Sequence, residues 1–218
     1  MVHTLVNIYG GNMHIRKHFF TSSIFLIILV FLFLFLLSKA YSDYIFKHIS
    51  DTFIRFHVIA NSNSTEDQII KYKVRDSVIN YLSPLLCDAK SKTEALEIIH
   101  SHQKEVEKVA SNVLKTNEKN NSIHVSVKKV KFPTKEYEKY ILPEGKYDSL
   151  QIEIGEAKGQ NWWCVMFPSI CFPSSTDNSQ EEKLYSLLDP EELSIISTDN
   201  ISPDIKFKFK LIELFENI

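Results

Sequence analysis

A long apolar block near the N-terminus constrains this chain more than any other feature. Residues 16–18 are basic, and residues 19–37 that follow are apolar apart from one threonine and two serines. The uninterrupted core, residues 24–37, is shorter than a full bilayer span, which takes about 20 residues. It fits the apolar region of a signal peptide. Counted from residue 19, the block is also long enough to stay as an anchor. Both interpretations place everything after Ala40 outside the cytoplasm.

The export signal also divides the chain into segments. Ser38 and Ala40 supply small residues at the positions where signal peptidases cut, so we predict cleavage after Ala40 as one outcome. We expect a cytoplasmic basic region (1–18), a signal peptide or membrane anchor (19–40), a tether (41–52), a folded domain (53–173), and a linker with a helical C-terminal extension (174–218).

Composition and motifs exclude several classes of function. The formal net charge is -2 and charges of both signs are interspersed, so we expect no nucleic-acid partner. The sequence holds no phosphate loop, HExxH, GxSxG or CxxC motif. His100 and His102 lie about 200 degrees apart around a helix, so they cannot chelate one metal. We predict no metal, no cofactor and no small-molecule substrate.

Strand patterns run through the folded domain. Residues 53–60, FIRFHVIA, are rich in β-branched and aromatic side chains and predict a central strand. Apolar residues alternate with polar ones over 123–127 and 150–154, which predicts two further strands. The pair Lys128 and Lys129 breaks the alternation and indicates a bulge or a strand end.

Helical spacing of apolar residues predicts helices over 65–82 and 92–114, each opened by a capping box, Thr65 with Gln68 and Ser91 with Glu94. We expect an α+β fold in which a small, mostly antiparallel sheet packs against these two long helices.

Other features of the helical segments carry expectations of their own. We interpret Asp67, Lys71 and Arg75, spaced four apart, as a solvated face. We expect Cys87 to be a small buried hydrophobe. Residues 181–196 predict a helix broken around Pro190, and apolar spacing after Pro203 predicts an amphipathic C-terminal helix.

Residues 159–173, GQNWWCVMFPSICFP, hold both tryptophans and two of the three cysteines. Trp162 and Trp163 would point to opposite sides of a strand, so one of them must face something other than the core. Cys164 and Cys171 can be bridged if the chain turns back between them, and export favours such a disulfide.

Two enzymatic alternatives remain open. Cys164 could be a thiolate nucleophile served by His57 or His124. Glu153 and Glu156 could act as the carboxylate pair of a glycosidase, although no second signature supports this chemistry.

Five stretches together resemble the stage II sporulation protein R family of endospore-forming bacteria: FIRFHVIANSNSTEDQIIKYKVRDSV, YLSPLL, FPTKEY, LPEGKYDSLQIEIGEAKG and NWWCVMFPSICF. The resemblance covers residues 53–172, and the final KFKFKLIELFENI resembles the tail of that family. Family patterns often show a proline where Ser169 stands in this chain.

The resemblance implies a signalling protein that is exported from the forespore into the space between the two septal membranes. There it would activate a membrane-embedded aspartic protease that processes pro-sigma-E. Its partners would be this protease and, if the N-terminal segment is uncleaved, the membrane. The alternative is an exported cell-wall or thiol-dependent hydrolase in the same space.

The resemblance also assigns expected roles to residues. We hypothesise that a loop framed by the Cys164–Cys171 disulfide binds the protease through Asn161, Trp162, Trp163 and Phe167. A second group matches the first family motif, and we expect it to be structural: Arg55, His57, Asn61, Asp67, Gln68, Arg75 and Asp76. For Arg55, Asn61, Asp67 and Arg75 the alternative is contact with a partner.

Overall fold

The computed structural model describes residues 2–137, 139–168 and 178–198. The chain divides into two units, Met1–Ile45 and Phe46–Ile218. In the first unit the apolar block lies in helix α1 (Val2–Thr52). Residues 22–52 of this helix are long and apolar enough to cross a membrane, which is compatible with a signal peptide or an anchor. Ala40 lies within α1 and is exposed, and cleavage after it stays a prediction.

The second unit is built on a four-stranded sheet with the strand order β2-β5-β1-β6. The central neighbours β1 and β5 run parallel, and the two outer pairs are antiparallel. The strands are β1 (Ile54–Ile59), β2 (Ile123–Phe132), β5 (Gly145–Ile154) and β6 (Asn161–Phe167). A separate small sheet pairs β3 (Lys135–Glu136) with β4 (Ile141–Leu142). The predicted α+β class and the mostly antiparallel sheet are confirmed.

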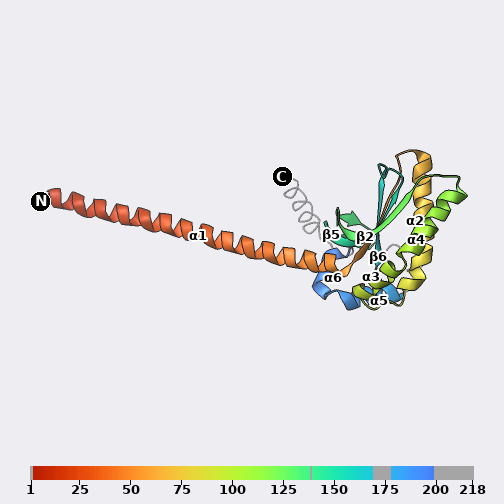
Figure 1. Cartoon of the computed structure of the whole chain (residues 1–218). Helices are drawn as coiled ribbons and strands as arrows, with labels where there is room; N and C mark the ends of the chain where they lie inside the picture. The colour runs from red at the N-terminus through yellow and green to blue at the C-terminus, as the bar shows by residue number, and fades with distance from the viewer. Residues whose placement is uncertain (1, 138, 169–177, 199–218) are drawn as a thin grey trace. The chain divides into compact units, whose positions relative to one another are not determined.

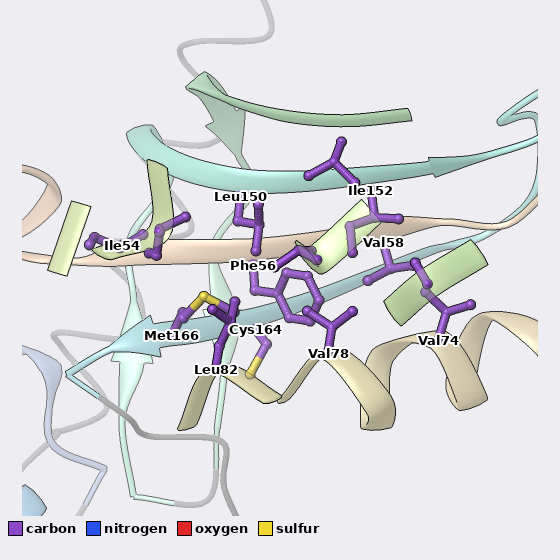
Figure 2. Close-up of a cluster of buried hydrophobic side chains, with 14 of the residues drawn as sticks. Ile54, Phe56, Val58, Val74, Val78, Leu82, Leu150, Ile152, Cys164 and Met166 are labelled. Atoms are coloured by element: carbon purple, nitrogen blue, oxygen red, sulfur yellow. The ribbon is translucent and has the colours of Figure 1, made fainter. Parts of the chain in front are cut away.

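Three helices pack on one face of the sheet: α2 (Thr65–Leu86), α3 (Lys92–Ser101) and α4 (Gln103–Thr116). The core between the two layers is apolar, and Figure 2 shows Phe56 and Cys164 directed from the sheet toward Leu82 of α2. Alternate residues of each strand face this core, as the period of two requires. We call this side of the sheet the helix face and the opposite side the polar face.

The second predicted helix is interrupted, because α3 ends and α4 begins at His102. The backbone of His102 leaves helical geometry, with φ -98 and ψ 4. Its ring is held by the Tyr81 hydroxyl, which lies 2.7 Å from His102 Nδ1. The first helix differs too, since it continues through Pro84 to Leu86 instead of ending near Leu82.

The cap of α2 is Ser64, one residue earlier than predicted. Its hydroxyl accepts a hydrogen bond from the Asp67 backbone N–H at 3.2 Å. Gln68, which we expected to complete the box, instead donates to the Ser62 carbonyl at 2.8 Å. The predicted cap of α3, Ser91, is confirmed by its bond from the Glu94 N–H.

The predicted irregularity at Lys128 and Lys129 is wrong, because β2 pairs with β5 in unbroken register from Ile123 to Phe132. The change in hydrophobic phase has another cause. Near the C-terminal end of β2, the side chains on the polar face are the more buried ones and those on the helix face are exposed. Phe132 is one of the buried side chains on the polar face. The sheet has its bulge in β6, where Ile54 pairs with Phe167 while Arg55 pairs with Val165.

The C-terminal segment supplies α5 (Asn178–Leu187) and α6 (Pro190–Ile196), which confirms a helix broken at Pro190. Ile196 is buried, and the Thr198 N–H donates to the Lys139 carbonyl at 2.9 Å. The amphipathic helix predicted after Pro203 lies outside the described residues. The predicted tether is helical through Thr52, and Ile49 within it is buried.

Candidate functional site

Strand register places mostly polar side chains in two rows across the polar face, and each row ends in an apolar residue of β6. The first row, from β2 to β6, is Ser126, Gln151, His57 and Trp163. The second row is Lys128, Ser149, Arg55 and Val165. The rows bring together residues about a hundred positions apart in sequence.

Arg55 is fully buried in the second row. Its Nε donates to the Cys164 carbonyl at 3.1 Å, and its Nη2 donates to the Tyr137 hydroxyl at 2.6 Å. The guanidinium carbon lies 4.5 Å from the ring centroid of Phe132 and 4.9 Å from that of Tyr147. Burial lowers the pKa of Arg55 and raises the pKa of both tyrosines. Arg55 therefore fastens the central strand to its neighbours, as a structural residue would.

His57 lies beside Arg55 on the same strand and stacks on Trp163, with ring centroids 3.8 Å apart and an interplanar angle of 13°. His57 Nε2 lies 3.0 Å from Asn161 Oδ1. Burial lowers the pKa of His57 to about 4, so the imidazole is neutral near pH 7. No described residue bonds His57 Nδ1, Gln151 Oε1 or Ser126 Oγ, which all belong to the first row.

Trp162 points to the helix face, at the edge of the sheet where α2 passes β6. Its ring lies 5.9 Å from the ring of Phe56 and 4.9 Å from the guanidinium carbon of Arg75. Arg75 also lies 4.8 Å from the ring of Tyr72. Tyr72 is 42% exposed and Ile69, one turn earlier, is 49% exposed. We call Ile69, Tyr72, Arg75 and Trp162 the aromatic edge.

A polar network ties the start of α2 to the loop between β5 and β6. Asp67 Oδ2 accepts hydrogen bonds from Ser62 Oγ at 2.6 Å and Asn61 Nδ2 at 2.8 Å. These bonds lower the pKa of the Asp67 carboxyl. Asn61 Oδ1 in turn accepts from the Glu156 backbone N–H at 3.0 Å. Asn61, Asp67 and Gln68 are therefore all occupied in holding two loops together.

Residues 50–177 of the chain match the family described as Stage II sporulation protein R. The chain belongs to the stage II sporulation protein R family. A curated relative, stage II sporulation protein R of Bacillus subtilis (strain 168), is 34% identical over 169 residues, which cover 78% of this chain and 74% of the relative. No solved structure matches the chain. The match identifies the chain as a sporulation protein and confirms the family seen in its motifs.

The tryptophan motif of this stage II sporulation protein R family member does not lie on one surface. Asn161 is exposed, Trp162 and Trp163 are half-buried, and Phe167 is buried in the core. The bulge in β6 turns Phe167 toward the helix face. Phe167 is therefore not exposed to a partner, whereas Trp162 lies at the aromatic edge.

The predictions for the three cysteines have different outcomes. Cys164 is buried on the helix face, and Cys171 lies outside the described residues, so their pairing stays a prediction. His57 and His124 are on strand positions that face the opposite side of the sheet from Cys164. Cys87 is exposed and free at the end of α2, so its expected burial is wrong.

The charged ladder on α2 is not the solvated face that its spacing predicted. Lys71 is buried, and its Nζ donates to Gln68 Oε1 at 2.6 Å and to the Gln160 carbonyl at 3.2 Å. Arg75 pairs with Asp76, Nε to Oδ1, at 2.6 Å. The ladder faces the end of β6, which four-residue spacing alone could not reveal.

The described residues offer little for hydrolysis. A groove of about 540 Å³ between α2 and α4 has Asp76 as its one carboxylate and contains no histidine or cysteine. Glu156, one of the two candidate glycosidase carboxylates, is exposed beside Lys158, whose ammonium lies 2.8 Å away and lowers the pKa of Glu156. A general acid needs the opposite shift.

Proposed function

We propose that this protein is an exported sporulation signal that acts between the forespore and mother-cell membranes. There it activates the membrane-embedded aspartic protease that processes pro-sigma-E. Family membership supports the sporulation role. The apolar helix supports export, because residues 22–52 can be inserted into a membrane either as a signal or as an anchor.

The observation that carries a binding role is the aromatic edge. Trp162 is only half-buried although it lies beside the core, and Tyr72, whose ring contacts the same guanidinium of Arg75, is 42% exposed. Tryptophan, tyrosine and arginine are enriched among the residues that dominate the energetics of protein interfaces. The two aromatic side chains give large contact areas at low entropic cost. A domain that presents these three side chains together is suited to bind a protein partner.

A signalling role fits the site better than the hydrolase alternative. The imidazole of His57 is buried and its pKa is about 4, so it is a poor general base near pH 7. Cys164 is buried on the other face of the sheet from both candidate histidines. No described arrangement favours the thiol or the glycosidase mechanism.

Reconstitution tests the proposal directly. The protease and pro-sigma-E are placed in liposomes, and the full chain is added so that its domain faces the extracytoplasmic side of the protease. We expect pro-sigma-E cleavage to depend on the added chain. Equal cleavage with and without the chain would refute the proposal.

A further inference from the structure

We propose that the aromatic edge binds a partner segment in which a carboxylate lies beside an apolar side chain. The carboxylate would bind Arg75, and the apolar side chain would contact Ile69 and Tyr72. This inference rests on the proposed function, because the segment would belong to the extracytoplasmic part of the protease.

Arg75 is held in place before any partner arrives. Its guanidinium carbon lies within 5 Å of two ring centroids, at 4.8 Å from Tyr72 and 4.9 Å from Trp162. Its Nε is paired with Asp76 Oδ1 at 2.6 Å. These contacts fix the plane of the guanidinium, so less entropy is lost when it binds a ligand.

The terminal nitrogens of Arg75 remain available. Nε is the atom that pairs with Asp76, and within the described parts of the chain neither Nη has a hydrogen-bond acceptor. Two parallel N–H groups at this end match the two oxygens of a carboxylate. The side chain of Arg75 is 24% exposed, so a partner can reach it.

Apolar exposure is concentrated at the same place. From residue 46 onward, the described part of the chain has three exposed large hydrophobic side chains, Ile69, Tyr72 and Tyr185. Two of the three, Ile69 and Tyr72, lie on α2, and Tyr72 is three residues from both Ile69 and Arg75. Tyr72 is therefore a helix neighbour of both Ile69 and Arg75, and the three side chains form a continuous strip that one partner segment can follow.

The local charge also favours an acidic ligand. Buried Lys71 lies 4.6 Å from the ring centroid of Tyr72, behind the exposed surface. The two positive charges of Lys71 and Arg75 are matched by one negative charge, that of Asp76, which is paired with Arg75. A partner carboxylate would restore the balance, whereas a cationic segment would be repelled.

Photo-crosslinking from the full chain locates the contact. A photoreactive phenylalanine analogue replaces Tyr72 in one variant and Tyr185 of α5 in a second, matched variant, since both tyrosines are exposed. Each variant is incubated with the protease in liposomes. We expect a crosslink to the protease from position 72 and none from position 185.

Charge substitutions identify the ligand chemistry. Arg75→Gln should lower both crosslinking from position 72 and pro-sigma-E cleavage by about tenfold or more, because it removes a charge-assisted bidentate contact. Arg75→Lys should recover only part of this loss, since lysine lacks the planar fork. Lys108→Gln, at an exposed cation of α4, is the control and should change neither readout.

A charge swap gives the strictest readout. Arg75→Glu should abolish cleavage, and one Asp→Arg or Glu→Arg substitution in the extracytoplasmic part of the protease should restore it. Tryptophan fluorescence checks that each variant is folded, because both tryptophans lie in β6.

The outcomes separate the two proposals. If the full chain stimulates cleavage but position 72 does not crosslink and Arg75→Gln is fully active, the aromatic-edge inference is overturned and the proposed function stands. If the unmodified chain does not stimulate cleavage, both are overturned. Both proposals are supported if the full chain stimulates cleavage, position 72 crosslinks to the protease, and the charge swap restores cleavage to Arg75→Glu.

Discussion

The imidazole of His57 stacks on the indole of Trp163, with ring centroids 3.8 Å apart and an interplanar angle of 13°. This contact joins the central strand β1 to the edge strand β6 through their paired positions. Phe132 closes the cluster edge-on, with its centroid 4.6 Å from that of Trp163. One tryptophan of the pair is thus used to stabilise the sheet, and the other, Trp162, remains for the aromatic edge.

The buried imidazole makes stability depend on pH. Burial lowers the pKa of His57 from 6.5 to about 4. Between these values the unfolded chain binds the extra proton and the folded chain does not, so the free energy of unfolding falls as pH falls. From about pH 7.5 to about pH 5 the loss attributable to His57 is about 2 kcal/mol.

Urea unfolding of the full chain in detergent, followed by tryptophan fluorescence at both pH values, measures this loss. His57→Gln should flatten the pH dependence by about that amount. An identical pH dependence in the variant and the wild type would show that His57 does not titrate as described.

Arg55→Lys should destabilise the domain by about 3 kcal/mol, although the charge is conserved. A lysine cannot donate both to the Cys164 carbonyl and to the Tyr137 hydroxyl while it lies between aromatic rings. Thermal or urea unfolding measures the loss. A variant as stable as the wild type would mean that these two hydrogen bonds contribute nothing.

Gly159→Ala tests the close approach of two loops. A Cβ at residue 159 would lie 2.6 Å from the carbonyl carbon of Ser62, so the backbone must shift. We expect a loss of about 2 kcal/mol. Gly145→Ala is the matched control, because its Cβ would meet Tyr147 Cε2 at 3.2 Å and require only a small adjustment. Equal losses in the two variants would contradict the predicted contact.

The double variant Cys164→Ser with Cys171→Ser distinguishes a structural bridge from a nucleophile. A disulfide predicts a loss of about 2–4 kcal/mol in stability with partial retention of signalling. A nucleophile predicts a fully stable protein that is inactive. Unfolding and pro-sigma-E cleavage are measured on the same preparation, because only the pair of values separates the two cases.

Local patterns predicted most of the elements. Alternation identified the strand around Leu150, and helical spacing identified the helix containing Val74 and Val78. The strand order was not predictable, because β1 and β5 pair in parallel across about a hundred residues and no local pattern records that pairing. The break at His102 was missed because the helical spacing of apolar residues continues across it, from Ile99 of α3 to Val106 of α4.

The sequence predicted which residues would form the candidate site but not how the fold arranges them. Adjacent Trp162 and Trp163 had to face opposite sides, and they do. The bulge that turns Phe167 inward has no sequence signal, because it depends on how β6 pairs with β1. The four-residue ladder predicted which side chains share a side of α2. It could not predict that Lys71 is buried, because the ammonium is held there by the carbonyl of Gln160 in the loop before β6.

The rate of pro-sigma-E cleavage with Trp162→Ala tests the central claim most directly. The reaction uses liposomes that contain the protease, with the wild-type full chain as reference and Trp163 fluorescence as the check on folding. The account predicts a folded variant whose cleavage rate is about tenfold or more below that of the wild type, since interface tryptophans carry about 2 kcal/mol or more. A folded Trp162→Ala variant that supports cleavage at the wild-type rate would contradict it.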